Sequence, residues 1–290
     1  MATVFGSYDQ GSLDEQYDNR AKVGAKLKDY LSFYATQSLL TRATLPASLN
    51  VSYGPSGPET LDIFPGEGDG PLPVQLFIHG GYWKALDAKD FSYVARAFQS
   101  RGILTLVLNY GFLPGISMAE LVAQCARAVV WTYRNITEFG GDPERIFISG
   151  HSAGGHLAAM MLMTDWQSLS VPQDVIKGAV GISGLYDLEP VKLCFINEDL
   201  KLTADDVARF SPVCHAPGTK APLLLTVGAE EGPEYLRQSA DLAAAWSAAG
   251  IHSRSTPMEG HNHFSIIEEL NDPGSALAQL MCEQMGVDTD

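Results

Sequence analysis

The stretch RIFISGHSAGGH, residues 145–156, passes from an apolar run into a glycine-rich turn, and the helical pattern LAAMMLM follows at 157–163. A Gly-x-Ser-x-Gly motif between a strand and a helix is typical of a nucleophile elbow, whose tight turn exposes the serine hydroxyl. Small neighbours let strand and helix approach, and the helix N-terminus adds positive potential where an oxyanion forms. We therefore predict that Ser152 is a nucleophile; a plain glycine-rich turn is the alternative.

Short apolar runs recur along the chain, at 74–78, 103–108, 145–149, 178–182 and 223–227. Runs of this kind suit strands that are buried on both faces, as in a parallel sheet. Helical patterns accompany them, at 88–100, 117–138, 153–164 and 233–249. Because strand and helix alternate, we predict an α/β fold with a mostly parallel central sheet flanked by helices. Upstream we expect one or two helices over about 12–40, and an antiparallel pair or edge strands at 49–53 and 60–64.

We expect the 290 residues to form a single domain, 1–290, because no linker, repeat or low-complexity tract divides them. A chain of this length buries enough surface to need no disulfide or metal to hold its core. The segment at about 187–220 interrupts the alternation of strands and helices. We expect this segment to form a small lid.

The chain carries 34 acidic and 19 basic residues, for a net charge of −15. An acidic surface repels phosphate groups, so we expect neither nucleic acid nor membrane as a partner. The four cysteines form no Cys-x-x-Cys pair, so separate reduced thiols are favoured over disulfides or a metal site. The N-terminus lacks an apolar signal core and no apolar run has membrane-spanning length, so we expect a cytoplasmic location.

The segment HGGYW, residues 79–83, closes the apolar run at 74–78. Where a nucleophile elbow is present, backbone N–H groups of this loop join that of the residue after the nucleophile in an oxyanion hole. Glycines let the backbone turn its donors toward the substrate. Comparison with enzymes that carry H-G-G-G indicates the amides of Gly81 and Tyr82, together with that of Ala153. An ordinary strand-ending turn is the alternative.

The general base is expected near the C-terminus, because the chain order with a nucleophile elbow is nucleophile, acid, histidine. Two of the seven histidines stand there, in the segment GHNHF at 260–264, before a helical pattern at 265–270. We favour His263 as the base. His261 is then a loop residue that packs or hydrogen-bonds nearby.

The acid is expected after the apolar run at 223–227, where Glu230 and Glu231 stand. A carboxylate in this place orients the imidazole and stabilises its cationic form, and Glu is an accepted variant of Asp. We choose Glu231, with Glu230 and then Asp187 as alternatives. Charged residues that follow a strand are most often only solvated, which is the other interpretation.

Together these segments resemble the kynurenine formamidase (arylformamidase) branch of the α/β-hydrolases. The motifs are H-G-G-x-W at 79–83, G-H-S-A-G-G-H at 150–156 after G-G-D-P at 140–143, and S-G-L-Y-D-L-E-P at 183–190. The similarity extends to the lid segment at 197–212, the segment at 227–239, N-H-F at 262–264 and Y-D-N-R at 17–20. The family's acidic residue falls on Glu231, and N-H-F supports His263.

The resemblance implies an α/β-hydrolase fold and a serine hydrolase that converts N-formyl-L-kynurenine to formate and kynurenine through an acyl-enzyme on Ser152. This reaction belongs to tryptophan catabolism. It requires neither a metal nor an organic cofactor, its partner is a small-molecule substrate, and a homodimer is the assembly that we consider. Candidates for an aromatic substrate pocket are Trp83, Tyr110, Phe112 and Tyr186, and core packing is the alternative for each.

Two other functions compete with this interpretation. The same machinery serves a carboxylesterase or an amidase of another small molecule, since a fold indicates the chemistry better than the substrate. A hydrolase-like binding protein without activity is disfavoured, because candidates for serine, histidine and acid are all present.

Overall fold

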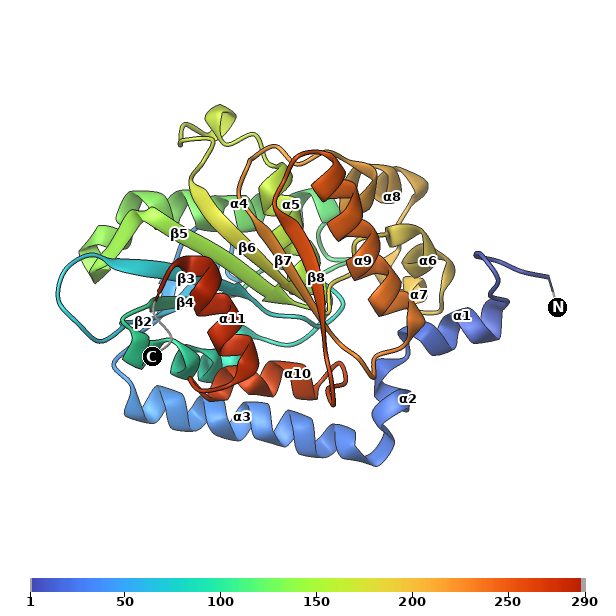
Figure 1. Ribbon diagram of the computed structural model, residues 1–290, viewed down its shortest axis with the longest axis horizontal. Helices are drawn as coiled ribbons and strands as arrows, with labels where there is room; N and C mark the ends of the chain where they lie inside the picture. Colours follow the sequence, from blue (N-terminus) through green and yellow to red (C-terminus); the bar gives the residue numbers. More distant parts are fainter. Residues whose placement is uncertain (1, 288–290) are drawn as a thin grey trace.

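An eight-stranded sheet crosses the molecule in the order β1-β2-β4-β3-β5-β6-β7-β8 (Figure 1). The computed structural model describes residues 2–287. The first two pairs, β1–β2 and β2–β4, are antiparallel, and all later pairs are parallel. The strands are β1 Ser48–Ser52, β2 Thr60–Phe64, β3 Leu72–Ile78, β4 Leu104–Leu108, β5 Gly141–His151, β6 Ile176–Ile182, β7 Leu223–Gly228 and β8 Ser253–Met258. The predicted mostly parallel sheet and its antiparallel edge pair are therefore confirmed.

The central strands are buried on both faces, as their apolar runs predict. In β3 the side chains of Leu76 and Ile78 join one hydrophobic core, while Phe77 between them joins a second core on the opposite face. Successive side chains of a strand point to opposite faces, so a continuous apolar run is what a sheet covered on both sides requires.

Helices cover both faces of the sheet (Figure 1). On one face lie α4 Met118–Asn135, α5 Ala153–Met163 and α9 Pro233–Ala248. On the other lie α3 Leu27–Thr44, the 3-10 helix η2 Ala88–Ala97, α10 Ser265–Glu268 and α11 Ala276–Met285. Two short helices, α1 Gln10–Tyr17 and α2 Asn19–Val23, precede α3. Shorter 3-10 turns occur at Gly24–Lys26, Gln99–Arg101, Ile136–Phe139, Gln167–Leu169, Pro212–Cys214 and Glu269–Asn271.

The segment at 187–220 lies between β6 and β7 and folds into three short helices, α6 Leu188–Leu193, α7 Asn197–Leu200 and α8 Ala204–Phe210. Its two ends are tied together, because the Ser211 hydroxyl accepts a hydrogen bond from the Leu188 amide at 3.0 Å. A capping box between Thr203 and Asp206 starts α8. The segment is thus an ordered insertion in the alternation of strands and helices.

The structure differs from the sequence-based expectations in three places. The N-terminal region forms three helices rather than one or two, and the pattern at 88–100 is a 3-10 helix with a short 3-10 turn after it. The strand β8 was not expected, because its sequence SRSTPM is polar and contains Pro257. Both features suit an edge strand, which is half solvated and tolerates proline.

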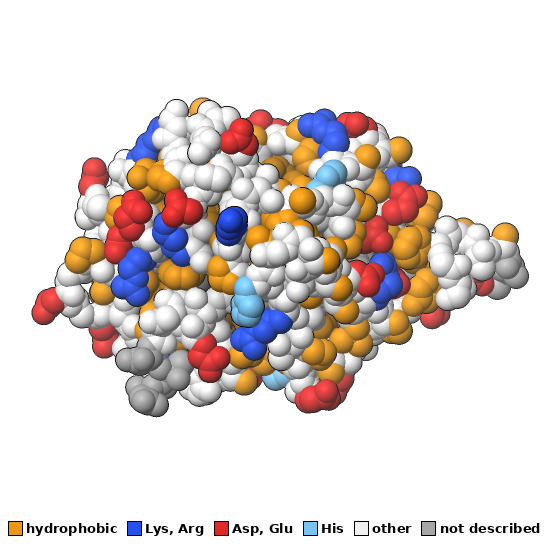
Figure 2. All heavy atoms as spheres, turned by 45° about the horizontal axis from the view of Figure 1, so that its top comes forward, with side chains coloured by type: hydrophobic (Ala, Val, Ile, Leu, Met, Phe, Trp, Pro, Cys, Tyr) orange, Lys and Arg blue, Asp and Glu red, His pale blue; other side chains and the backbone are white. Residues whose placement is uncertain are grey.

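The surface is charged and mixed. On the face shown in Figure 2, Asp and Glu side chains alternate with Lys and Arg, and apolar side chains lie scattered between them. Within residues 2–287, no helix has the length and apolar character needed to cross a membrane.

Candidate active site

The turn between β5 and α5 has the geometry of a nucleophile elbow. Ser152 adopts φ 57° and ψ −121°, a strained conformation for a residue with a Cβ. A Cβ at Gly154 would collide with the carbonyl oxygen of Ile78, and one at Gly150 would collide with that of Gly154. The glycines of the motif therefore let α5 pack directly against the ends of β3 and β5.

Ser152, His263 and Glu231 form one hydrogen-bonded chain. His263 Nε2 is 3.0 Å from Ser152 Oγ, and His263 Nδ1 is 2.7 Å from Glu231 Oε2. Because a carboxylate only accepts, Nδ1 donates to it, and Nε2 faces the serine hydroxyl as the acceptor. The structure thus brings together the three residues selected from the sequence, from the ends of β5, β7 and β8.

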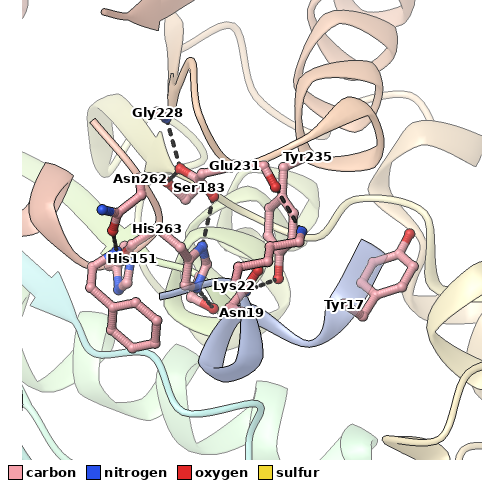
Figure 3. Close-up of polar contacts among 12 residues, drawn as sticks. Tyr17, Asn19, Lys22, His151, Ser183, Gly228, Glu231, Tyr235, Asn262 and His263 are labelled. Atoms are coloured by element: carbon pink, nitrogen blue, oxygen red, sulfur yellow. Dashed lines mark hydrogen bonds and ion pairs between the residues drawn. The ribbon is translucent and has the colours of Figure 1, made fainter. Parts of the chain in front are cut away.

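The Glu231 carboxylate is fully enclosed and hydrogen-bonded on its other oxygen (Figure 3). Its Oε1 accepts hydrogen bonds from the amide of Gly228, at 2.7 Å, and from the hydroxyl of Ser183. Hydrogen bonds to the charged form compensate for the loss of water around a buried carboxylate. Gly228 and Ser183 thereby aim Oε2 at His263.

A second histidine supports the loop that carries His263. His151 Nε2 donates a hydrogen bond to the backbone oxygen of His263 at 2.8 Å. Burial holds the pKa of His151 well below its ordinary value, so this imidazole is neutral and has one N–H to donate. The side chain of Asn262 accepts from the amides of Phe264 and Ser265 at 2.9 and 3.1 Å. The loop is therefore held on both sides of His263.

The alternative acid and base residues lie outside this chain of hydrogen bonds. His261 Nε2 is 3.6 Å from Glu269 Oε1. Glu230 is exposed, and Asp187 caps α6 and pairs with Arg237. The geometry thus favours His263 over His261 and Glu231 over both alternatives.

The loop after β3 runs beside Ser152 in an unusual backbone conformation. Gly81, Tyr82 and Trp83 have φ values of 110°, 50° and 55°. A Cβ at Gly81 would collide with the carbonyl oxygen of Ala85, so the tight turn requires glycine there. Gly81 and Tyr82 line the same cavity as Ser152. Ala153 is the first residue of α5, where an amide has no partner within the helix.

Ser152 and His263 open onto a cavity of about 210 Å³. One wall comes from the N-terminal region, residues 17–20 with Leu27, Leu31 and Tyr34, and Phe195 and Ile196 contribute from the 187–220 segment. The aromatic lining residues are Tyr17, Tyr34, Tyr82, Phe91, Phe195 and Phe264. A wider groove of about 680 Å³ along α4 contains none of these residues.

The four predicted pocket residues do not line this cavity. Trp83 is buried and its indole N–H donates to His156 Nδ1 at 3.2 Å. Tyr110 stacks on His79 at 4.4 Å, and Phe112 meets Tyr110 edge-on at 5.9 Å. Tyr186 lies buried between β6 and its following turn, where it fills the space above Gly181. Trp83 and Tyr186 lie inside motifs, whereas Tyr110 and Phe112 follow β4. All four pack against the hydrophobic core, Phe112 only in part, and none lines this cavity, which corrects the prediction.

The sequence also indicates that the N-terminal region lines the cavity, although the sequence analysis above does not include this wall. Leu27, Leu31 and Tyr34 are spaced i, i+4 and i+7, so they share one face of α3. The Y-D-N-R segment at 17–20, which carries part of the family resemblance, lies directly upstream of that helix. Together they indicate that the N-terminal region reaches the site.

Two kynurenine formamidases are similar to this chain over most of its length. A kynurenine formamidase from Salmo salar is 32% identical over 279 residues, which cover 93% of each chain. One from Danio rerio is 31% identical and covers 84% of each chain.

This chain belongs to the kynurenine formamidase family.

The wider set of similar proteins places the family among α/β-hydrolases. The BD-FAE family model matches residues 61–245. A crystal structure from Silicibacter sp. TM1040, described as a candidate thioesterase, is 33% identical, covers 92% of this chain and 97% of its own, and has a TM-score of 0.80. The carboxylesterase EstE1, from a metagenomic library, shares the fold with a TM-score of 0.69 at 18% identity and covers 92% of this chain and 99% of its own. The chain is therefore a hydrolase with the α/β-hydrolase fold.

Proposed function

We propose that this enzyme hydrolyses N-formyl-L-kynurenine to formate and kynurenine through a formyl-enzyme on Ser152. The observation that carries the proposal is the hydrogen-bonded chain from Ser152 through His263 to Glu231, at 3.0 and 2.7 Å, at the floor of a small cavity with aromatic walls. The kynurenine formamidase relatives support the choice of substrate.

In the first half of the reaction, His263 Nε2 takes the proton of the Ser152 hydroxyl as the oxygen attacks the formyl carbon. The amides of Gly81, Tyr82 and Ala153 hold the negative oxygen of the tetrahedral intermediate. His263 then gives its proton to the departing aniline nitrogen, which leaves as kynurenine and leaves the formyl group on Ser152.

In the second half, water replaces the amine. His263 takes a proton from water as its oxygen attacks the formyl ester, and then returns a proton to the Ser152 oxygen as formate leaves. Glu231 stabilises the imidazolium that forms in both halves, and its own charge is held by Gly228 and Ser183.

The cavity suits a small acyl group joined to an aromatic amine. Its volume of about 210 Å³ lies below the range of about 300–1,000 Å³ common for drug-sized ligands. Aromatic walls allow a ring to stack. Asp18 and Arg20 also line the cavity and carry opposite charges, as a zwitterionic amino-acid group requires.

A carboxylesterase is the second candidate function. It is favoured by an Arabidopsis thaliana relative named isoprenylcysteine alpha-carbonyl methylesterase, which is 27% identical over 77% of this chain and 57% of its own. The same serine machinery cleaves esters, which have better leaving groups than amides.

The two functions are separated by steady-state kinetics of the purified enzyme with N-formylkynurenine and with p-nitrophenyl acetate. We expect a higher kcat/KM for the formamide, although the ester is chemically easier to cleave. Efficient ester cleavage without detectable deformylation would contradict the formamidase proposal and leave a serine esterase.

Four further properties stay predictions: the cytoplasmic location, the homodimer, the lid role of 187–220 and the single-domain organisation.

A further inference from the structure

A chain of hydrogen bonds, buried in part, joins the N-terminal segment to the loop after β3 and to the first turn of α9. Asn19 Nδ2 donates to the Tyr235 hydroxyl at 2.7 Å, the hydroxyls of Tyr235 and Tyr82 are 2.8 Å apart, and Tyr82 donates to the backbone oxygen of Tyr17 at 2.8 Å. A carbonyl only accepts, so the single proton of Tyr82 goes to Tyr17, and the Tyr235 hydroxyl donates to Tyr82. Every bond in the chain therefore has one donor and one acceptor.

This chain joins three segments that surround the site: the N-terminal segment, the loop after β3 and the start of α9. Tyr82 belongs to the loop after β3, where it and Trp83 hold left-handed φ values of 50° and 55°. Residues with a Cβ keep such a conformation only when surrounding contacts hold it. The hydrogen bonds of the Tyr82 hydroxyl, at the far end of its side chain, are contacts of this kind.

Tyr235 belongs to the first turn of α9, four residues after Glu231. Its ring centroid lies 4.9 Å from that of His263, so it also packs against the base. Lys22 Nζ donates to the backbone oxygen of Glu231 at 2.7 Å (Figure 3). It also donates to the backbone oxygen of Gln16 at 2.6 Å. The N-terminal segment thus holds the acid-bearing loop from the side opposite to Ser183 and Gly228.

We propose that Tyr82 is a positioning residue, whose phenol sets the loop after β3, which carries the oxyanion amides proposed above, at a fixed distance from the loop that carries Glu231. This proposal rests on the catalytic roles given above for Ser152, Glu231 and His263. The hydroxyl touches no reacting atom and acts through Tyr235 and Tyr17. Its effect is therefore expected in the tetrahedral state, where the oxyanion amides bind, and not in the binding of the substrate.

The test is Tyr82→Phe, which removes the hydroxyl and keeps the ring. A control is Tyr93→Phe: Tyr93 is fully buried, does not line the cavity, and its hydroxyl has no hydrogen-bond partner among residues 2–287. We expect Tyr82→Phe to lower kcat with p-nitrophenyl acetate roughly three- to tenfold, the value of one hydrogen bond, while KM stays within about twofold. Tyr93→Phe should change neither constant.

The affinity of phenylboronic acid, which forms a tetrahedral adduct with an active serine, separates positioning from general loosening. In Tyr82→Phe the Ki of phenylboronic acid should rise by the same factor as kcat falls. The kcat is calculated per active site, and the active sites are counted by fluorophosphonate labelling. An unchanged Ki and kcat per labelled site would overturn the proposal. So would a loss of kcat that Tyr93→Phe reproduces.

Tyr235→Phe provides a second variant if Tyr82→Phe does not fold. Because both hydroxyls act through one chain of hydrogen bonds, the kcat of the double variant should be no lower than that of the less active single variant. Multiplicative losses would show that the two phenols act separately and would contradict the proposal. A wild-type enzyme that reacts with neither the ester nor the fluorophosphonate would instead contradict the proposed function, so the two failures are distinguishable.

Discussion

The floor and the wall of the active site are built in different ways. The floor consists of short motifs at strand ends, where Gly150, Ser152 and Gly154 lie within five residues. The wall is assembled from α3, the 187–220 segment and the loop after His263, which are far apart in the chain. The catalytic motifs of this enzyme are therefore encoded locally, whereas the shape of its cavity depends on how distant segments pack.

If this division holds, changes in the floor should abolish turnover and leave the fold intact. Ser152→Ala should lower kcat by roughly four to six orders of magnitude, since triad members act as a unit. Adding His263→Ala should cost little more. Near-multiplicative losses in the double variant, at an unchanged Tm, would show that Ser152 and His263 do not work together.

The two neighbouring histidines offer a sharper test within one loop. His263→Ala should inactivate the enzyme, because it removes the acceptor 3.0 Å from Ser152 Oγ. His261→Ala, which only releases Glu269, should retain most of the activity. Steady-state assays of both variants decide the point, and the reverse result would move the base to His261.

The acid should matter less than the nucleophile. Glu231→Gln places an amide against His263 Nδ1, which favours the wrong tautomer and cannot stabilise the imidazolium; we expect kcat to fall by roughly two to four orders of magnitude. Glu230→Gln is the matched control, because its side chain is exposed. Equal losses in both variants would place the acid elsewhere.

A change in the wall should affect the substrate and spare the chemistry. Phe195 lines the cavity and is 42% exposed, so Phe195→Ala should raise the KM for an aromatic formamide roughly two- to tenfold, as expected for a lost ring contact, with kcat unchanged. Leu169→Ala, at a similar exposure of 38% and outside the cavity, is the control. A fall in kcat at constant KM would contradict the prediction, because it would show that the cavity wall affects the chemical step.

The smallest expected effect concerns stability. Burial raises the pKa of Glu268 to about 7, so the folded state binds this proton more tightly than the unfolded chain. The free energy of unfolding should therefore fall as pH rises from about 5 to about 8. Glu268→Gln should remove this loss. Relative to wild type, its free energy of unfolding should be greater at pH 8 than at pH 5 by on the order of 1 kcal/mol, because partial exposure of the side chain weakens the effect.

Urea unfolding of both proteins at the two pH values measures the difference. Parallel pH profiles would mean that Glu268 ionises in the folded state as an ordinary carboxyl does.

The division between floor and wall also explains what the sequence could predict. Gly150 and Gly154 are demanded by close backbone contacts, so the elbow is visible in the residue types themselves. The position of His263 followed from chain order and a short motif. Strands that are buried on both faces could be predicted equally well from their apolar runs. The strand β8 could not be predicted, because its polar edge sequence has no such pattern.

The cavity lining could not be predicted in the same way. Tyr110 and Phe91 are both aromatic residues that follow a motif loop or an inner strand, yet only Phe91 reaches the cavity. Which side a ring takes depends on the packing of α3 and η2, and this is a property of tertiary structure rather than of local sequence.

The proposed mechanism depends on Ser152 as a nucleophile that His263 activates. Mass-spectrometric mapping of the enzyme after reaction with a fluorophosphonate tests it directly, in the wild type and in His263→Ala and His261→Ala. We predict that the label lies on Ser152 in the wild type and in His261→Ala, and that labelling is strongly slowed in His263→Ala. A label on another residue, or equal labelling rates in all three proteins, would contradict these roles of Ser152 and His263.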